Sequence, residues 1–120
     1  MNFFDKKSQC VVKNGEMLCK FKNGSTESIP YPGENTVPLT IWKSYDCPKN
    51  LCGKINKNVS KINKNLSNIY NVSEKYIEDE QNLPSELLTI PSIAIGNKML
   101  FSNNEMTEHQ FIERTKHYLS

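Results

Sequence analysis

An amphipathic helix beginning near Cys52 is the clearest element that this sequence predicts. From that cysteine onward, apolar side chains recur at alternating spacings of three and four residues, at Ile55, Val59, Ile62, Leu66 and Ile69. This spacing places them on one face of an α-helix, and Lys and Asn occupy most of the remaining surface. We therefore expect a helix of about five turns over residues 52–69, with one face buried.

Short apolar segments on both sides of this helix predict strands. Residues 37–42 are typical of a buried strand, in which Pro38 is tolerated because it stands at the strand's start. Residues 74–79 are a plausible second strand, and residues 93–95 and 99–101 are expected to form a hairpin. Together these segments predict one sheet packed against the helix.

Two further helical segments are expected in the second half of the chain. Residues 83–88 predict a short helical turn at most. A closing helix over residues 107–119 begins with the sequence Thr107-x-x-Gln110, which is a capping-box signature. Apolar residues on one face of that segment predict that it packs on the sheet.

Residues 8–29 predict a β-meander. Asn14-Gly15 and Asn23-Gly24 are both typical of two-residue type I′ hairpin turns between β-branched and apolar segments. We therefore expect three short antiparallel strands before the main sheet.

The first of these turns fixes the register of two cysteines. Counting outward from Asn14-Gly15, Cys10 faces Cys19 at a non-hydrogen-bonded position, where side chains approach most closely. That geometry suits a disulfide. The alternative is a pair of small buried thiols on one face of the sheet, as expected in a reducing cytoplasm.

The segment between the meander and the main sheet is stiff. Residues 30–38 contain three prolines and a glycine, which prevent a regular element from beginning before their end. The sequence therefore predicts an N-terminal β-meander extension over residues 1–35 and a second domain over residues 36–120.

Composition restricts the classes of partner. The net charge is +2, from 15 basic and 13 acidic residues in mixed order, so no basic surface for nucleic acid is expected. No apolar run approaches the roughly 18–20 residues that cross a bilayer, and the N-terminus resembles no signal peptide. We therefore expect a cytoplasmic protein without a membrane partner, with a viral particle or another assembly as an alternative location.

A second cysteine pair frames the start of the long helix. Cys47-Pro48 follows the strand at 37–42, Cys52 opens the helix, and Ile90-Pro91 precedes the C-terminal hairpin. From residue 36 to residue 119 this order resembles the thioredoxin/glutaredoxin superfamily, and the Cys-Pro pair and an aromatic residue five positions before it are most similar to glutaredoxins. The resemblance implies an α/β, thioredoxin-like fold: a four-stranded mixed sheet with flanking helices and a cis Ile90–Pro91 bond.

The resemblance also implies a function. Cys47 would be the attacking thiolate and Cys52 the resolving thiol of a thiol–disulfide oxidoreductase that acts on protein thiols and disulfides. Ile90 and Pro91 would present backbone to an extended substrate. Four residues separate these cysteines here, whereas the family has two. In a regular helix residues five apart lie on different faces, so the pair cannot close if both cysteines are helical; if Pro48 to Asn50 form a loop before the helix, the sulfurs could meet.

The residues around Cys47 favour a reactive thiolate. The N-terminus of a helix offers unpaired N–H groups and positive potential, both of which stabilise the thiolate. Lys43 and Lys49 are close in sequence and add positive charge, whereas Asp46 opposes them. We expect Cys47 to be the more exposed and the more acidic of the two thiols.

Two features of the glutathione-binding family members are missing. The segment 101–105, which follows the hairpin, lacks the family's glycines, and Ser44 stands where a lysine is usual. Glutathione is therefore a doubtful partner.

Alternatives to an enzyme remain. The widened cysteine spacing also fits a catalytically inactive thioredoxin-fold protein with a structural or interaction role in a larger assembly. Zinc is disfavoured because the cysteine spacings are unlike zinc knuckles, and because His109 and His117 stand eight residues apart on the last helix. We expect no cofactor and no metal.

Overall fold

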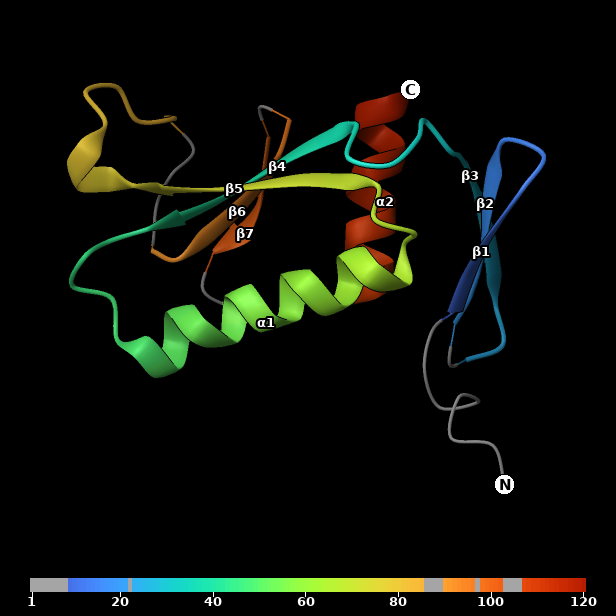
Figure 1. The fold of residues 1–120 in the computed structure, drawn as a ribbon, viewed down its shortest axis with the longest axis horizontal. Helices are drawn as coiled ribbons and strands as arrows, with labels where there is room; N and C mark the ends of the chain where they lie inside the picture. The colour runs from blue at the N-terminus through green and yellow to red at the C-terminus, as the bar shows by residue number, and fades with distance from the viewer. Residues whose placement is uncertain (1–8, 22, 86–89, 97, 103–106) are drawn as a thin grey trace.

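The computed structural model describes residues 9–21, 23–85, 90–96, 98–102 and 107–120, and within them the chain forms two β-sheets and two α-helices (Figure 1). The first sheet has the antiparallel order β1-β2-β3, with bounds Gln9–Lys13, Glu16–Lys20 and Thr26–Pro30. The second has the order β5-β4-β6-β7, with β4 at Val37–Lys43, β5 at Tyr70–Tyr76, β6 at Ser92–Ile95 and β7 at Lys98–Ser102. The helices are α1, Lys49–Asn65, and α2, Glu108–Leu119. The expected α/β character is confirmed.

The register of the first hairpin is confirmed. Cys10 pairs with Cys19, and the φ angles of Asn14 and Gly15 are 55° and 77°, both positive as a type I′ turn requires. The structure joins Cys10 and Cys19 in a disulfide whose Cα atoms lie 4.0 Å apart. Of the two arrangements that the sequence left open, the structure therefore has the bonded one.

The second hairpin turn was predicted wrongly. Five residues, rather than two, separate β2 from β3, because Lys20 pairs with Thr26. Gly24 has a φ of 88°, and the side-chain oxygen of Asn23 accepts a hydrogen bond from the backbone N–H of Ser25 at 2.9 Å. This local side-chain bond offers the backbone an alternative to the type I′ turn, so Asn-Gly in sequence did not define the loop length.

The second sheet is mixed. β4 pairs in parallel with β5 and antiparallel with β6, and β6 pairs antiparallel with β7. β5 begins at Tyr70, four residues before the predicted strand, because the Asn63 side chain bonds both backbone groups of Tyr70, at 2.9 and 3.3 Å. The last three residues assigned to that strand, Ile77–Asp79, instead form a 3₁₀ turn. We call Ile77–Asp79 the acidic turn.

The long helix begins and ends earlier than its apolar spacing predicted. It ends at Asn65 in a Schellman motif: Ser67 N–H donates to Lys64 O, and Asn68 N–H to Asn63 O at 2.7 Å. Ser67 takes the left-handed conformation, with φ 58°. Leu66 and the residues after this turn remain buried, which is why the periodic pattern continues beyond the helix.

The closing helix agrees closely with its prediction. Thr107 caps α2, and its hydroxyl accepts the Gln110 N–H while the Gln110 side chain accepts the Thr107 N–H. The capping box is therefore confirmed. Half of the helical turn expected at residues 83–88 is described, and residues 83–85 are not helical; residues 86–88, and Asn97 in the β6–β7 turn, lie outside the described residues.

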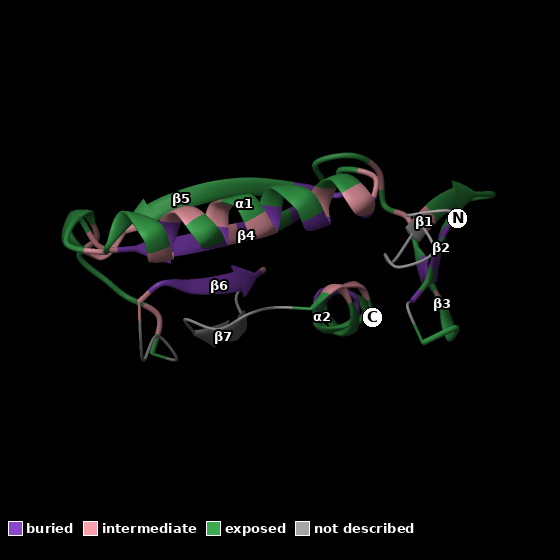
Figure 2. Ribbon diagram, turned by 90° about the horizontal axis from the view of Figure 1, so that it is seen from below, coloured by how far each residue is buried: buried purple, intermediate pink, exposed green. Residues whose placement is uncertain are grey.

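Both helices pack on one face of the four-stranded sheet. On β5, Tyr70 and Glu74 are four residues apart and share a face. Tyr70 meets Phe111 of α2 at a ring-centroid distance of 5.8 Å, and Glu74 accepts a hydrogen bond from Asn56 of α1 at 3.1 Å. Figure 2 shows β6 and much of β4 buried, whereas β5 is exposed over most of its length. No helix in the described part of the chain is long and apolar enough to cross a membrane.

The meander shares the core of the second sheet. Met17, Phe21 and Ile29 belong to the same buried cluster as the residues of β4, α1 and α2. Ion pairs reinforce the contact, since Glu27 of β3 lies 3.8 Å from Lys116 of α2. Figure 1 shows the meander beside α2 at one end of the molecule, and the loop that leads into α1 at the other end.

Candidate redox site

Cys47 and Cys52 are joined by a disulfide with a Cα–Cα distance of 6.2 Å. The expected loop over Pro48 to Asn50 is not what brings the sulfurs together, because α1 already begins at Lys49 with Pro48 as its N-cap. Cys47 stands one residue before the cap and Cys52 is the fourth helical residue. Side chains at these two positions approach each other in the hydrophobic staple, so a spacing of five permits contact when the first residue lies outside the helix.

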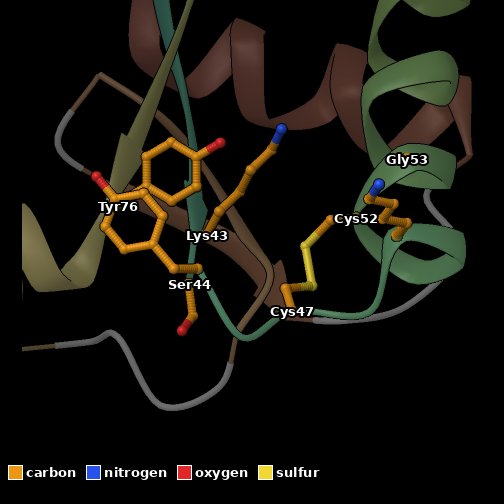
Figure 3. A pocket seen from close by; sticks show the side chains of 8 residues that line it. Lys43, Ser44, Cys47, Cys52, Gly53 and Tyr76 are labelled. Carbon is orange, nitrogen blue, oxygen red and sulfur yellow. A yellow bond between two sulfur atoms is a disulfide. The ribbon is translucent and has the colours of Figure 1, made fainter.

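The two cysteines differ in exposure, as predicted. Cys47 is half-buried, whereas Cys52 is 8% exposed. Figure 3 shows Cys47 on the incoming chain and Cys52 on the helix, with their sulfurs bonded. A pocket of about 330 Å³ opens beside them, lined by Lys43, Ser44, Tyr45, Cys47, Lys49, Cys52, Gly53 and Tyr76.

The two lysines that were expected to add positive charge at Cys47 differ in the structure, because Lys43 is paired with a carboxylate. Lys43 is buried, and its ammonium group forms an ion pair with the Glu74 carboxylate. Figure 3 shows its amino group directed away from the two sulfurs. Lys49 is exposed, lines the pocket and is the first residue of α1, whose first turn contains no acidic side chain. Lys49 and the helix N-terminus therefore supply the potential that favours a thiolate, and Lys43 is largely neutralised.

The Lys43–Glu74 pair gives the fold a dependence on pH. Hydrogen bonding to Lys43 is the main cause that lowers the pKa of Glu74 below its ordinary value of 4.5, and Asn56 contributes in the same direction. A carboxyl with a depressed folded pKa stabilises the protein above the unfolded pKa, and this contribution is lost as pH falls through the folded pKa. The loss therefore begins near pH 4.5 and continues below it.

Glu74→Gln is expected to destabilise the protein at pH 7 by up to about 1 kcal/mol, because half-exposed ion pairs are screened by solvent. It should also reduce the loss of stability between pH 5 and pH 3 relative to wild type. Urea unfolding at both pH values measures the two effects. Lys75→Gln is a matched control, because Lys75 pairs with Glu80 outside the pocket at 3.6 Å. If the loss of stability between pH 5 and pH 3 is the same in Glu74→Gln as in wild type, the Lys43–Glu74 pair is not its cause.

The loop between β4 and α1 is held by the acidic turn. The Ser44 hydroxyl and the Tyr45 N–H both donate to the Glu78 carboxylate, the latter at 3.1 Å. The Tyr45 hydroxyl donates to Asp79 at 2.5 Å, and the Tyr45 ring stacks on Tyr76 at a centroid distance of 4.4 Å. Glu78 and Asp79 of the acidic turn are therefore partners of the cysteine loop. Sequence analysis missed this contact because no local pattern relates residues 33 or 34 positions apart.

These contacts shift two pKa values. The hydrogen bond from Ser44 is the main cause that lowers the pKa of Glu78, so its carboxylate persists into the acid range. The hydrogen bond to Asp79 is the main cause that raises the pKa of Tyr45 to about 12. At neutral pH both groups already have the protonation states that the contacts need, and the shifts extend that range to lower pH for Glu78 and to higher pH for Tyr45.

Ile90 and Pro91 stand at the end of the sheet from which the cysteine loop leaves. The Ile90–Pro91 bond is cis, as the resemblance implied. Ser92, the first residue of β6, pairs with Trp42 of β4, so Pro91 lies near the level of Lys43, the last residue before the loop. Pro91 is buried and Ile90 is half-buried.

Among the described residues, one group could present three ligand atoms to a metal: Glu27, His109 and Glu113. It joins β3 to α2 rather than lining the disulfide pocket. Glu27 lies 3.6 Å from His109 and already faces the ammonium group of Lys116. His109 also packs edge-on against Phe21 at 5.0 Å, so it takes part in the contact between the meander and α2. These contacts give the group a structural role.

Comparison of the chain with protein-family models, with curated protein sequences and with solved structures finds no match.

Proposed function

We propose that the protein is a thiol–disulfide oxidoreductase that exchanges disulfides with other proteins through Cys47 and Cys52. The observation that carries the proposal is the asymmetry of this disulfide. Its first sulfur is half-buried beside a pocket and outside the helix, whereas its second is buried in the first turn. An incoming thiolate therefore has better access to Cys47 than to Cys52, as an exchange reaction with a defined order requires.

The exchange balances without a cofactor. A substrate thiolate attacks the Cys47 sulfur, the bond between Cys47 and Cys52 breaks, and Cys52 leaves as a thiolate. A second substrate thiolate then attacks the substrate sulfur of the mixed disulfide and releases the Cys47 thiolate. Two electrons pass from the substrate dithiol, which becomes a disulfide, to the protein. The reverse sequence reduces a substrate disulfide, and the reduction potentials of the two partners set the direction.

A thioredoxin-like fold is part of this proposal. The strand order β5-β4-β6-β7, with one parallel and two antiparallel pairs, supports it, as does the placement of both helices on one face. The register that brings Pro91 to the loop end of β4 supports a role for Ile90 and Pro91 in binding an extended substrate chain next to Cys47. Protein thiols and disulfides are accordingly the proposed partners.

A trapping experiment tests the proposal. Cys52→Ser is expected to accumulate a mixed disulfide through Cys47 when it is mixed with a reduced protein substrate and a mild oxidant, or with disulfide-bonded insulin, because the resolving thiol is lost. Non-reducing electrophoresis and peptide mapping would locate the bond. Cys47→Ser is the matched control and should trap little, since only the buried Cys52 remains. Equal trapping by both variants, or by neither, would favour the inactive structural alternative.

A further inference from the structure

The loop that carries Cys47 is ordered by hydrogen bonds rather than by burial. Its residues Tyr45 and Asp46 are exposed, and only five residues connect β4 to α1. An exposed loop retains conformational entropy unless specific contacts remove it. The Tyr45 side chain contacts Asp79 and Tyr76, and the contacts that reach Cys47 begin at the carboxylate of Glu78.

A relay of hydrogen bonds leads from that carboxylate to Cys47. Glu78 accepts from the Ser44 hydroxyl and from the Tyr45 N–H. The Ser44 hydroxyl oxygen in turn accepts from the Asp46 N–H at 3.2 Å, and the Ser44 carbonyl accepts from the Cys47 N–H at 3.0 Å. The position of Ser44 therefore decides where the next three residues lie, and Glu78 fixes the position of Ser44.

We propose that Glu78 is a positioning residue that holds Cys47 opposite Cys52 and thereby sets the reduction potential of their disulfide. The inference rests on the proposed function only in treating this disulfide as the redox centre. Closing a disulfide depends on the effective concentration of one thiol at the other, and this concentration rises when the loop that carries Cys47 is held in the closed geometry. Glu78 therefore stabilises the disulfide relative to the dithiol.

Charge and hydrogen bonding can be separated at this position. The charged groups that line the pocket or contact the cysteine loop include Lys49 on α1, the Lys43–Glu74 pair on the strands, and Asp79, which accepts from Tyr45; Asp46 is itself part of the loop. Glu78→Gln removes the negative charge but keeps an oxygen that can accept from Ser44, whereas Glu78→Ala removes both. If Glu78 acts by positioning the loop, the two variants should have different reduction potentials. If it acts through its charge alone, their reduction potentials should be equal.

The sequence offers a matched control two residues away. Glu80 follows the acidic turn, is half-buried, and pairs with Lys75 instead of with the cysteine loop. Glu80→Ala therefore removes a carboxylate of the same kind from the same region without releasing Ser44. Ser44→Ala provides a second way to break the relay, from the loop side, and decides the question if Glu78→Ala fails to fold.

The experiment is a redox titration in dithiothreitol buffers, with alkylation and peptide mapping to report the Cys47–Cys52 pair separately from Cys10–Cys19. Glu78→Ala and Ser44→Ala are each expected to shift the dithiol–disulfide equilibrium about tenfold toward the dithiol, which is about 30 mV. Glu78→Gln should lie between Glu78→Ala and wild type, and Glu80→Ala should match wild type. Circular dichroism confirms that each variant is folded.

Equal potentials for Glu78→Ala, Ser44→Ala and wild type would overturn the inference, as would an equal shift in Glu80→Ala. The readout uses a small thiol, so it does not require turnover of a protein substrate. If the Glu78 and Ser44 variants shift the reduction potential but Cys52→Ser never traps a substrate, the proposed function is wrong and the role of Glu78 stands. Normal trapping of a substrate, with the reduction potentials of the variants unchanged, would leave the proposed function standing and remove the role of Glu78.

Discussion

Replacing Cys47 by serine is expected to reduce thiol–disulfide exchange to the uncatalysed rate, whereas replacing Cys10 and Cys19 together should leave exchange in place. A serine hydroxyl is hardly ionised at neutral pH and cannot form the mixed disulfide. The remaining sulfurs cannot substitute for it. Cys52 is 8% exposed and Cys19 is 1% exposed. The Cys10–Cys19 disulfide also lies in the meander, at the opposite end of the molecule from the α1 loop (Figure 1).

The measurement is the reduction of insulin by dithiothreitol, followed by turbidity, with wild type, Cys47→Ser and the Cys10→Ser/Cys19→Ser pair. Alkylation of the reduced protein by iodoacetamide across a pH series gives the acidity of Cys47 separately. Substantial acceleration by Cys47→Ser would show that another sulfur carries the reaction. If the wild type accelerates nothing and Cys47 titrates near 8.5, as a free thiol does, the inactive structural alternative is correct.

Local patterns in the sequence predicted the elements that local contacts define. The Asn14-Gly15 turn gave the correct register because a two-residue turn leaves the strands no freedom to slip. The capping box at Thr107 and Gln110 marked the start of α2 correctly, since both of its hydrogen bonds lie within one helical turn. In these cases the residues that decide the structure are within ten positions of one another.

Two of the errors occurred where residues distant in the sequence decide the structure. Tyr70 begins β5 because it pairs with Val37 of β4, 33 positions away, and no periodicity in its own segment indicates this. Lys43 was expected to raise the potential at Cys47, but its partner Glu74 lies 31 positions away. Apolar spacing cannot show which charge an ammonium group will meet, so the electrostatics of the candidate site could not be predicted from sequence.

The cysteine spacing shows how a local irregularity can be misread. The spacing of five was interpreted as excluding a bond between two helical cysteines, with a loop over Pro48 to Asn50 as one way for the sulfurs to meet; the structure starts α1 at Lys49 and leaves Cys47 and Pro48 outside it. Proline is favoured at the first positions of helices because it lacks the N–H that would be unpaired there. The Cys-Pro pair was therefore a better marker of the helix start than Cys52. Cys47, just before the N-cap, and Cys52, the fourth helical residue, occupy the two positions of a hydrophobic staple, which is why their sulfurs can bond.

Removing the Cys10–Cys19 disulfide is expected to lower the free energy of unfolding by about 2.5–3 kcal/mol. The two cysteines are nine positions apart, and the chain-entropy model gives a value of this size for so short a loop. Cys19 is also part of the core shared with α2, so loosening the hairpin would weaken the packing of Met17 and Ile29. We therefore expect one cooperative transition at lower urea concentration, rather than separate melting of the meander.

Urea unfolding of oxidised wild type and of Cys10→Ala/Cys19→Ala measures this effect. The adjacent cross-strand pair Val11 and Leu18 provides the control, because it joins the same two strands but is 59% and 42% exposed. Val11→Ala/Leu18→Ala should cost less than about 1 kcal/mol, the usual range for an exposed cross-strand pair. If the cysteine variant is no less stable than this control, the Asn14-Gly15 turn and the apolar core hold the hairpin without help from the disulfide.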